Sequence, residues 1–224
     1  MMNNFENVNN RRTRPAKPPL SLDIIIKTAY KLLSENGISG MSMRKIAKAL
    51  DTGPASLYVY VKNYQKLSAY VLDYGLREVK LVENDTVYWK DAIINILKSY
   101  FKVLVETPGL AELALTTPPN GMNSMDINEC LLKYLQTGGI SKRGAAWGID
   151  ILLLYVSSLS FERTRRSKKD NDLDDMVALY NKVDVSKYPM IGMLKSELFS
   201  GEGDERFSWG IEVILQGLLT MQNS

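Results

Sequence analysis

The sequence has no histidine and a single cysteine, Cys130, among its 224 residues. Without histidine, Ser-His-Asp and Cys-His catalysis in their usual forms are excluded, and the commonest transition-metal ligand is missing. One cysteine allows no intramolecular disulfide and cannot build a zinc site, and a lone thiol suits a reducing cytosol. Ser-x-x-Lys pairs begin at Ser42 and Ser99, but the other motifs of that nucleophile class are absent. We therefore expect a protein that is not an enzyme and holds no metal or cofactor.

Long apolar runs are also scarce. The longest begins at Ile151 and extends for about a dozen residues before Glu162, whereas a membrane span needs about 20. Residues 1–10 are polar and Asn-rich, where a secretory signal would need an apolar run. We therefore expect a soluble, cytoplasmic protein with no membrane partner.

Positive charge is concentrated near the N-terminus. The whole chain carries a net charge of +3. Residues 1–80 contain 13 Lys and Arg against 6 Asp and Glu, a net +7, and residues 81–224 contain 15 against 19, a net −4. A basic N-terminal third on an acidic remainder favours a polyanion-binding head on a body with another role. A solvated, lysine-rich surface would give the same counts.

Helical periodicity and cap residues predict an all-α protein that begins with a helix-turn-helix. Residues 1–19 are Asn-rich, then basic, then Pro-rich, and are predicted to form a flexible basic arm. Residues 20–67, here called the head, contain apolar residues at helical spacing over 22–36 and a second helix capped by Ser42. A third helix follows the turn at 51–53, with Pro54 at its first position. This order is typical of a DNA-binding domain of three helices.

The remaining residues, 68–224, are here called the body and are predicted to form a larger helical domain for ligand binding and dimerisation. Its first part, 68–84, reads as a connecting helix. Turn signals such as Gly138-Gly139 separate the further helices, and the charge-segregated stretch 163–175 reads as a mobile linker. These helices are expected at roughly 88–106, 109–115, 125–137, 142–161, 173–182, 188–199 and 207–221. The apolar helices at 142–161 and 207–221 favour a four-helix dimer interface, although they could instead form the core of one subunit.

The third helix has an outward face that is suited to a DNA groove. At about 100° per residue, Pro54, Leu57 and Val61 fall on one side and are expected to pack inward. Tyr58 and Tyr60 flank this buried stripe, and a third set of side chains points away from it. That set is Ala55, Ser56, Val59 and Lys62. Because the outward face carries hydroxyl and aromatic groups and no acid, it could enter a major groove without repelling phosphates.

The stretch MSMRKIAKALDTGPASLYVYVKNYQKL, residues 41–67, resembles the DNA-binding domain of the TetR family of transcriptional repressors. The family pattern has a Ser/Thr cap, then an Arg and an Ile-Ala pair, a Leu-Tyr-x-His/Tyr segment and a Lys-Asn-Lys sequence. Here these positions are Ser42, Arg44, Ile46-Ala47, Leu57 to Tyr60, and Lys62-Asn63-Tyr64. Residues 110–115 and 207–219 are similar to the C-terminal region of the family. The resemblance implies an all-helical homodimer whose body binds a small molecule.

The predicted contacts with double-stranded DNA follow from side-chain chemistry. The forked Arg44 side chain can bond guanine O6 and N7 together, or it could clamp a phosphate. Ser56 could reach a base edge or a phosphate, and Ala55 and Met43 could touch a thymine methyl group. The tyrosines and lysines are expected to hold the phosphate backbone, where Tyr64 replaces the family's usual lysine. The predicted set is Met43, Arg44, Thr52, Ala55, Ser56, Tyr58, Tyr60, Lys62, Tyr64 and Lys66.

Aromatic and Met side chains of the body are candidates for a pocket that binds an apolar or aromatic effector, although such residues at helical spacing more often form core. They are Trp89, Tyr100, Phe101, Met122, Met125, Trp147 and Tyr155. The sequence therefore predicts a ligand-responsive DNA-binding regulator, a homodimeric repressor that a small molecule releases from a palindromic operator. The alternative is a helical interaction module whose basic head binds RNA or an acidic protein.

Overall fold

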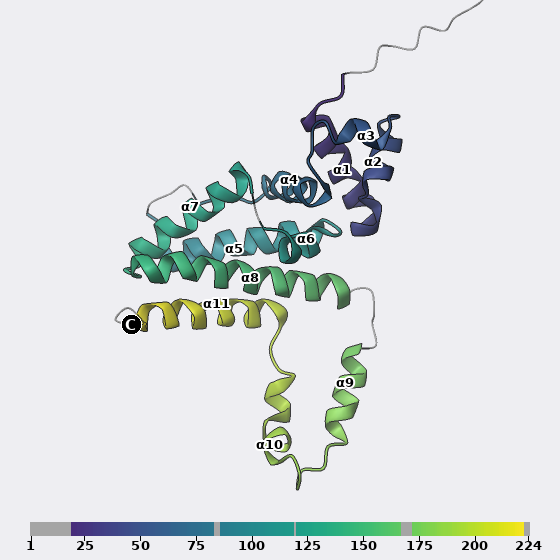
Figure 1. Cartoon of the computed structure of the whole chain (residues 1–224). Coiled ribbons are helices and arrows are strands. Elements are labelled where there is room, and N and C mark those ends of the chain that lie inside the picture. The colour runs from purple at the N-terminus through teal and green to yellow at the C-terminus, as the bar shows by residue number, and fades with distance from the viewer. Residues whose placement is uncertain (1–18, 83–85, 119, 167–171, 222–224) are drawn as a thin grey trace, which may run out of the picture.

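The computed structural model describes residues 19–82, 86–118, 120–166 and 172–221, and every regular element in these ranges is helical (Figure 1). The predicted basic arm lies outside the described residues except for Pro19. In chain order the elements are α1 (Leu22–Asn36), η1 (Ile38–Gly40), α2 (Met43–Ala49), α3 (Pro54–Leu57), α4 (Tyr64–Leu76), α5 (Trp89–Glu106), α6 (Leu110–Thr116), α7 (Met122–Thr137), α8 (Lys142–Arg166), α9 (Asp172–Asn181), α10 (Pro189–Leu198) and α11 (Gly203–Thr220).

The head is a small three-helix unit whose helix starts agree with the predicted caps. The Ser21 hydroxyl accepts a hydrogen bond from the Ile24 amide at 3.3 Å, and the Ser42 hydroxyl accepts one from the Lys45 amide at 3.3 Å. These bonds satisfy backbone donors that would otherwise lack partners in the first turn. The short 3₁₀ turn η1, which the periodicity did not predict, connects α1 to α2.

The third helix is shorter than expected. Regular α-helix covers α3 and is followed by a turn at Tyr58 to Tyr60, in which the Tyr60 amide donates to the Leu57 carbonyl at 3.0 Å. Leu57 and Val61 are buried, as predicted, whereas Pro54 is exposed and the inward position predicted for it is wrong. Pro54 occupies the first turn of α3, where its missing amide costs no hydrogen bond.

The connecting helix is α4, which begins and ends earlier than the predicted 68–84. Asn63 caps it, and its Oδ1 accepts from the Lys66 amide at 2.7 Å. After Leu76 the chain turns, Val79 enters the core, and the Lys80 amide donates to Ser99 Oγ on α5 at 2.8 Å. These interactions with α5 take the place of further helical turns.

The body is layered, with α5, α6 and α7 on one side of α8 and α11 on the other (Figure 1). Helix α8 is longer than predicted, and residues 163–166 belong to it rather than to a linker. Of the described helices, only α8 is long and apolar enough to cross a membrane by length and composition, a test that core helices also pass. Its residues Ala145, Leu152 and Val156 are buried in the body core.

Helices α9 and α10 form a hairpin that projects away from the body beneath α11 (Figure 1). The rings of Tyr180 and Phe199 meet edge to face, with centroids 5.2 Å apart, and hold its two helices together. No described side chain between residues 174 and 206 is buried. The hairpin is therefore outside the hydrophobic core, although several of its exposed side chains are large and apolar.

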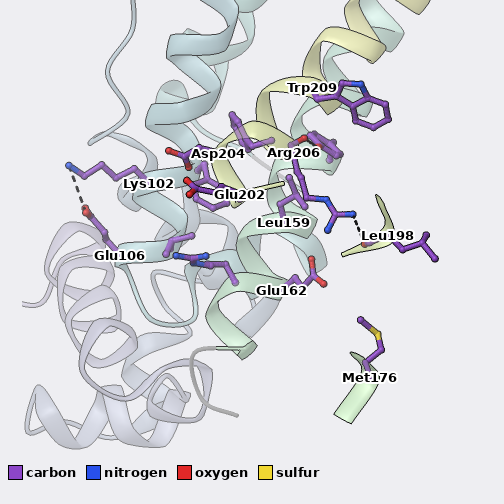
Figure 2. A pocket seen from close by; sticks show the side chains of 16 residues that line it. Lys102, Glu106, Leu159, Glu162, Met176, Leu198, Glu202, Asp204, Arg206 and Trp209 are labelled. Carbon is purple, nitrogen blue, oxygen red and sulfur yellow. Dashed lines mark hydrogen bonds and ion pairs between the residues drawn. The ribbon is translucent and has the colours of Figure 1, made fainter. Parts of the chain in front are cut away.

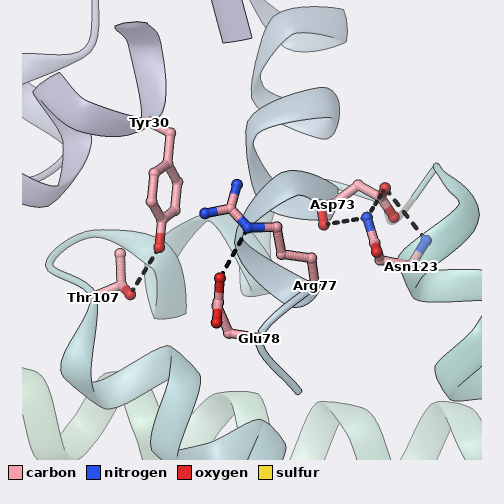
Figure 3. Close-up of polar contacts among 6 residues, drawn as sticks. All are labelled: Tyr30, Asp73, Arg77, Glu78, Thr107 and Asn123. Atoms are coloured by element: carbon pink, nitrogen blue, oxygen red, sulfur yellow. Dashed lines mark hydrogen bonds and ion pairs between the residues drawn. The ribbon is translucent and has the colours of Figure 1, made fainter. Parts of the chain in front are cut away.

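Polar contacts join α4 to the body and the head to the α5–α6 connection (Figure 3). On α4, Asp73 accepts hydrogen bonds from Asn123 and Ser124 at the start of α7. The Arg77 guanidinium lies 3.5 Å from the centre of the Tyr74 ring. On α1, the Tyr30 hydroxyl and the Thr107 hydroxyl are hydrogen-bonded at 3.4 Å. The head is thus connected to the body by α4 and by specific side chains on α1.

Candidate nucleic-acid interface and ligand cavity

The head presents most of the predicted DNA-contacting side chains to solvent. Tyr58 is 52% exposed and Tyr60 is 40% exposed, while their neighbours Leu57 and Val61 are buried. The exposed members of the predicted set are Arg44, Ala55, Tyr58, Tyr60, Lys62 and Tyr64, and the half-buried members are Thr52, Ser56 and Lys66. The stretch from Thr52 to Leu72 contains no acidic residue. From Thr52 onward this surface therefore combines aromatic, hydroxyl and cationic groups without a carboxylate to repel phosphate, and the exposed acid nearest to it in the sequence is Asp51.

Met43 is the exception within the predicted set. It is the first residue of α2, is only 9% exposed, and packs in the core with Ile46 and Ala47. A thymine methyl contact would require this side chain to leave the core. We therefore correct its assignment from the DNA surface to the core of the head.

The α2 helix adds cations that the sequence prediction did not include. Lys45 and Lys48 are exposed on the same short helix as Arg44, and the Lys45 ammonium donates to the Ser39 carbonyl at 2.6 Å. The i, i+4 spacing of Arg44 and Lys48 is a signal that could have identified the second cation from the sequence.

The start of α4 lies next to this surface and suits a phosphate. Backbone amides at a helix N-terminus carry partial positive charge and attract anions. Lys62 precedes the cap residue Asn63, Tyr64 is the first residue of the helix, and the Lys66 ammonium lies 4.9 Å from the centre of the Tyr70 ring. Lys62 and Lys66 therefore supply positive charge, and Tyr64 supplies an exposed hydroxyl at the position where the family usually has lysine.

A second feature is a cavity of about 1020 Å³ between α5, α8, the start of α11 and the α9–α10 hairpin (Figure 2). Phe101 and Tyr155, both predicted ligand residues, line it. The Phe101 ring meets Phe207 edge to face at 5.3 Å, and the Tyr155 hydroxyl donates to the Arg206 carbonyl at 3.1 Å. Partial burial raises the pKa of Tyr155, although the positive charge of Arg206 opposes this shift. The phenol is therefore neutral at physiological pH.

Charged side chains surround the aromatic part of the cavity (Figure 2). Lys102 and Glu106 form an ion pair at 3.7 Å, and the Arg206 guanidinium donates to the Leu198 carbonyl at 3.5 Å. The other charged lining residues are Glu162, Arg163, Glu202 and Asp204. The cavity thus has aromatic walls and polar groups of both signs, as is usual where a few polar contacts orient an apolar ligand.

The other predicted ligand residues do not line this cavity. Met122, Met125 and Trp147 are exposed, and Trp89 is half-buried against Gly138. Tyr100 is buried, and its hydroxyl is hydrogen-bonded to Ser157 at 3.2 Å; burial raises its pKa although this bond lowers it. Exposure or core packing places these five residues away from this cavity. The lining residues missed by the sequence prediction include Leu159, Met176, Leu198, Phe207 and Trp209, most of them in segments that only the tertiary fold brings to α5.

The family of the chain is shown by comparison with known proteins. Residues 25–67 match the profile described as bacterial regulatory proteins, tetR family, and residues 82–222 match the tetracyclin repressor-like C-terminal domain. The chain belongs to the TetR family. It is accordingly a ligand-responsive DNA-binding transcriptional repressor and not an enzyme, so the family assignment decides against the interaction-module alternative.

Other known proteins resemble this chain over nearly its full length. An HTH-type transcriptional regulator of Saccharopolyspora erythraea is 27% identical over 204 residues, which are 90% of this chain and 86% of the relative. The crystal structure of apo ActR from Streptomyces coelicolor has a TM-score of 0.82 at 31% identity, covering 92% of this chain and 97% of that one. ActR in complex with actinorhodin gives a TM-score of 0.82 at 30% identity, covering 92% and 100%.

The TetR body also exposes an apolar face formed by α8 and α11. Five large apolar side chains on this face are between 49% and 70% exposed: Trp147, Ile151, Leu154, Trp209 and Val213. Both helices were predicted as dimer helices, and each also buries a separate face against the body core. Among the described residues, no group of three or more His, Cys, Asp or Glu side chains is placed to hold a metal ion.

Proposed function

We propose that this TetR-family chain works as a homodimer that binds a near-palindromic operator through its two heads. An apolar or aromatic small molecule in the cavity beside α5 would release it from the DNA. The observation that carries this proposal is the arrangement of the head, where Arg44, Tyr58 and Tyr60 are exposed. Leu57 and Val61, on either side of the two tyrosines in the sequence, are buried, and no acidic residue occurs from Thr52 to Leu72. Such a protein acts in the cytoplasm, where the chromosome lies.

The proposed contacts divide into base reading and backbone binding. Arg44 is suited to guanine because its two forked donors match the O6 and N7 acceptors in the major groove. Ser56 and Ala55 lie in α3, near enough to the surface to meet base edges. Tyr58, Tyr60, Lys62, Tyr64 and Lys66 would hold phosphates and sugars, and Thr52 would do so from the turn before α3.

The exposed α8–α11 face supports a dimer of this chain. Several large apolar side chains exposed to water on two neighbouring helices are unfavourable, and a second copy would bury them through the same residues. The two α8 and two α11 helices would form a four-helix bundle. The dimer would place its two recognition segments about 34–36 Å apart, which is one turn of DNA.

The cavity supports the proposed effector class. Its volume of about 1020 Å³ is at the upper end of the range for pockets that hold drug-sized ligands. Phe101, Tyr155 and Phe207 offer aromatic surface. ActR, at 30% identity, has been crystallised with actinorhodin. An effector that binds better to a body conformation with the wrong head spacing would shift the population of the dimer away from DNA. Helix α4, which joins head and body, is expected to transmit this conformational change to the head.

Equilibrium binding to fluorescent duplexes tests the DNA-binding part. We expect salt-sensitive binding to a palindromic duplex selected from a random library. Arg44→Ala and Tyr58→Ala should each lower the affinity of one head for its half-site about tenfold or more. Lys98→Ala, which removes an exposed cation from α5 in the body, is the control and should leave affinity unchanged. Equal affinity for every duplex and for RNA would contradict the proposal.

A thermal-shift screen of planar aromatic compounds, with actinorhodin as the first, tests the effector part. A compound that stabilises the protein should also release the selected duplex. The variant Leu159→Trp places an indole in the cavity and should lose both responses, whereas Met125→Trp, on the exposed surface of α7, should keep them. Unchanged release from Leu159→Trp would show that the effector binds elsewhere.

A further inference from the structure

Val59 is the most exposed large apolar side chain among the described residues, at 80%. Single exposed apolar residues are common on protein surfaces, so exposure alone does not indicate a role. Val59, however, lies between Tyr58 and Tyr60 on the surface that is proposed to meet DNA. The sequence pattern also placed it on the outward side of the recognition segment, without giving it a role.

The backbone holds Val59 in a hydrogen-bonded turn. The amides of Tyr60 and Val61 both donate to the Leu57 carbonyl at 3.0 Å, and the side chains of Leu57 and Val61 are 0% and 1% exposed. Because these anchors are in the core of the head, the residue between them cannot turn inward without opening that core. A β-branched side chain also has a restricted χ1 angle, so its two methyl groups have a defined direction.

Valine has neither a hydrogen-bond donor nor an acceptor in its side chain, so it cannot bond a phosphate or the polar edge of a base. In the major groove, the apolar group available to it is the C5 methyl of thymine, which the other three bases of DNA lack. Tyr58 and Tyr60, on either side, carry the hydroxyl groups that could bind the backbone. We propose that Val59 determines operator sequence by packing against a thymine methyl group in each half-site.

This inference rests on the proposed DNA-binding function and adds a specificity residue to it. The test begins with a duplex that the full-length wild-type protein selects from a random palindromic library. Each thymine is then replaced in turn by deoxyuridine, which removes only the methyl group. At one thymine per half-site we expect about a fourfold loss of affinity, the effect of one buried methyl group.

The variant Val59→Ala should bind the thymine and deoxyuridine duplexes with nearly equal affinity, whereas Val59→Thr should keep part of the preference because one methyl group remains. Val185→Ala removes the same atoms from another exposed valine, in the α9–α10 hairpin, and should keep the full preference. Melting temperatures of the variants report whether each is folded.

Two results separate the possible failures. If the wild-type protein selects no duplex, the proposed DNA-binding function itself is wrong. If it selects a duplex but no thymine position distinguishes wild type from Val59→Ala, the role of Val59 is overturned and the DNA-binding function stands. A uniform loss of affinity for all duplexes in Val59→Ala would also overturn the inference, because it would indicate a backbone contact.

Discussion

The buried carboxylate of Asp73 connects α4 to the N-terminus of α7, and its neutralisation should weaken both stability and head–body coupling. Asp73 is 8% exposed. Its Oδ1 accepts from the Ser124 amide at 2.9 Å and from the Ser124 hydroxyl at 2.8 Å. Its Oδ2 accepts from the Asn123 side-chain amide at 2.9 Å (Figure 3). The N-cap residue of α7, Gly121, has no side chain to do this. Asp73 therefore caps α7 from a different helix.

The variant Asp73→Asn keeps the shape of the side chain but removes its charge and turns one acceptor oxygen into a donor. Hydrogen bonds to a charged group contribute about 1.5–3 kcal/mol each, and a lost N-cap costs about 0.5–2 kcal/mol. Because the variant keeps one acceptor oxygen, we expect the free energy of unfolding to fall by about 3 kcal/mol. For a protein of this size, that is a decrease in melting temperature of roughly 6–12 °C.

Thermal and urea denaturation measure this loss, with Asp91→Asn as the matched control. Asp91 is also an acid near a helix N-terminus, in the first turn of α5, but it is exposed. An exposed acid at a helix start contributes about 0.3–1 kcal/mol. If Asp73→Asn costs no more than Asp91→Asn, the reasoning about a buried cap is refuted.

Gly121 provides an independent test of the same contact. Its φ of −174° is extended backbone that alanine also adopts, but an added Cβ would lie 2.1 Å from the Asp73 Cγ. Gly121→Ala should therefore displace the carboxylate. The double variant should lose less stability than the sum of the losses in Gly121→Ala and Asp73→Asn, because both substitutions break the same set of hydrogen bonds.

Three further predictions follow from other contacts. Burial raises the pKa of the Cys130 thiol, so the folded protein should react with iodoacetamide at about pH 8 more slowly than the unfolded chain, and equal rates would contradict the burial. The hydrogen bond from Lys90 to Glu212 raises the pKa of Lys90 above its usual value. The stabilisation from this ion pair is present below the lysine pKa of the unfolded chain and is lost as pH rises through the pKa of Lys90 in the folded protein. Glu212→Gln should therefore destabilise the protein less at pH 11.5 than at pH 8, which are about one unit above and two units below the lysine pKa of the unfolded chain. Leu154→Arg, on the exposed face of α8, should yield monomers in analytical ultracentrifugation, whereas Met125→Arg on α7 should remain dimeric.

Much of the head could be predicted from the sequence because its signals are local. The hydroxyls of Ser21 and Ser42 cap the helices that immediately follow them, and helical spacing placed Leu57 and Val61 in the core. Such features depend on neighbours within one or two turns. Periodicity was less reliable at Pro54, where packing between helices decides which side is covered. Met43 was assigned to the DNA surface by its side-chain chemistry, although it packs in the core of the head.

The candidate ligand site was predicted only in part, for a different reason. Phe101 and Tyr155 were assigned to a pocket by residue type, and the same criterion selected Trp147 and Met125, which are exposed. Residue type does not distinguish a cavity wall from a core or an interface. The missing information is which helices lie beside one another.

The sequence alone determined the helical class, the helix-turn-helix and the acid-free outward side of the third helix, because these follow from residues close along the chain. The cavity and the Asp73 contact were decided by tertiary structure. The cavity needs Phe101 to meet Phe207, and the contact needs Asp73 to meet Ser124, 51 residues further along. Such contacts form only when packing of the apolar helix faces brings distant segments together. The spacing of residues within one helix does not indicate which distant residues it will meet.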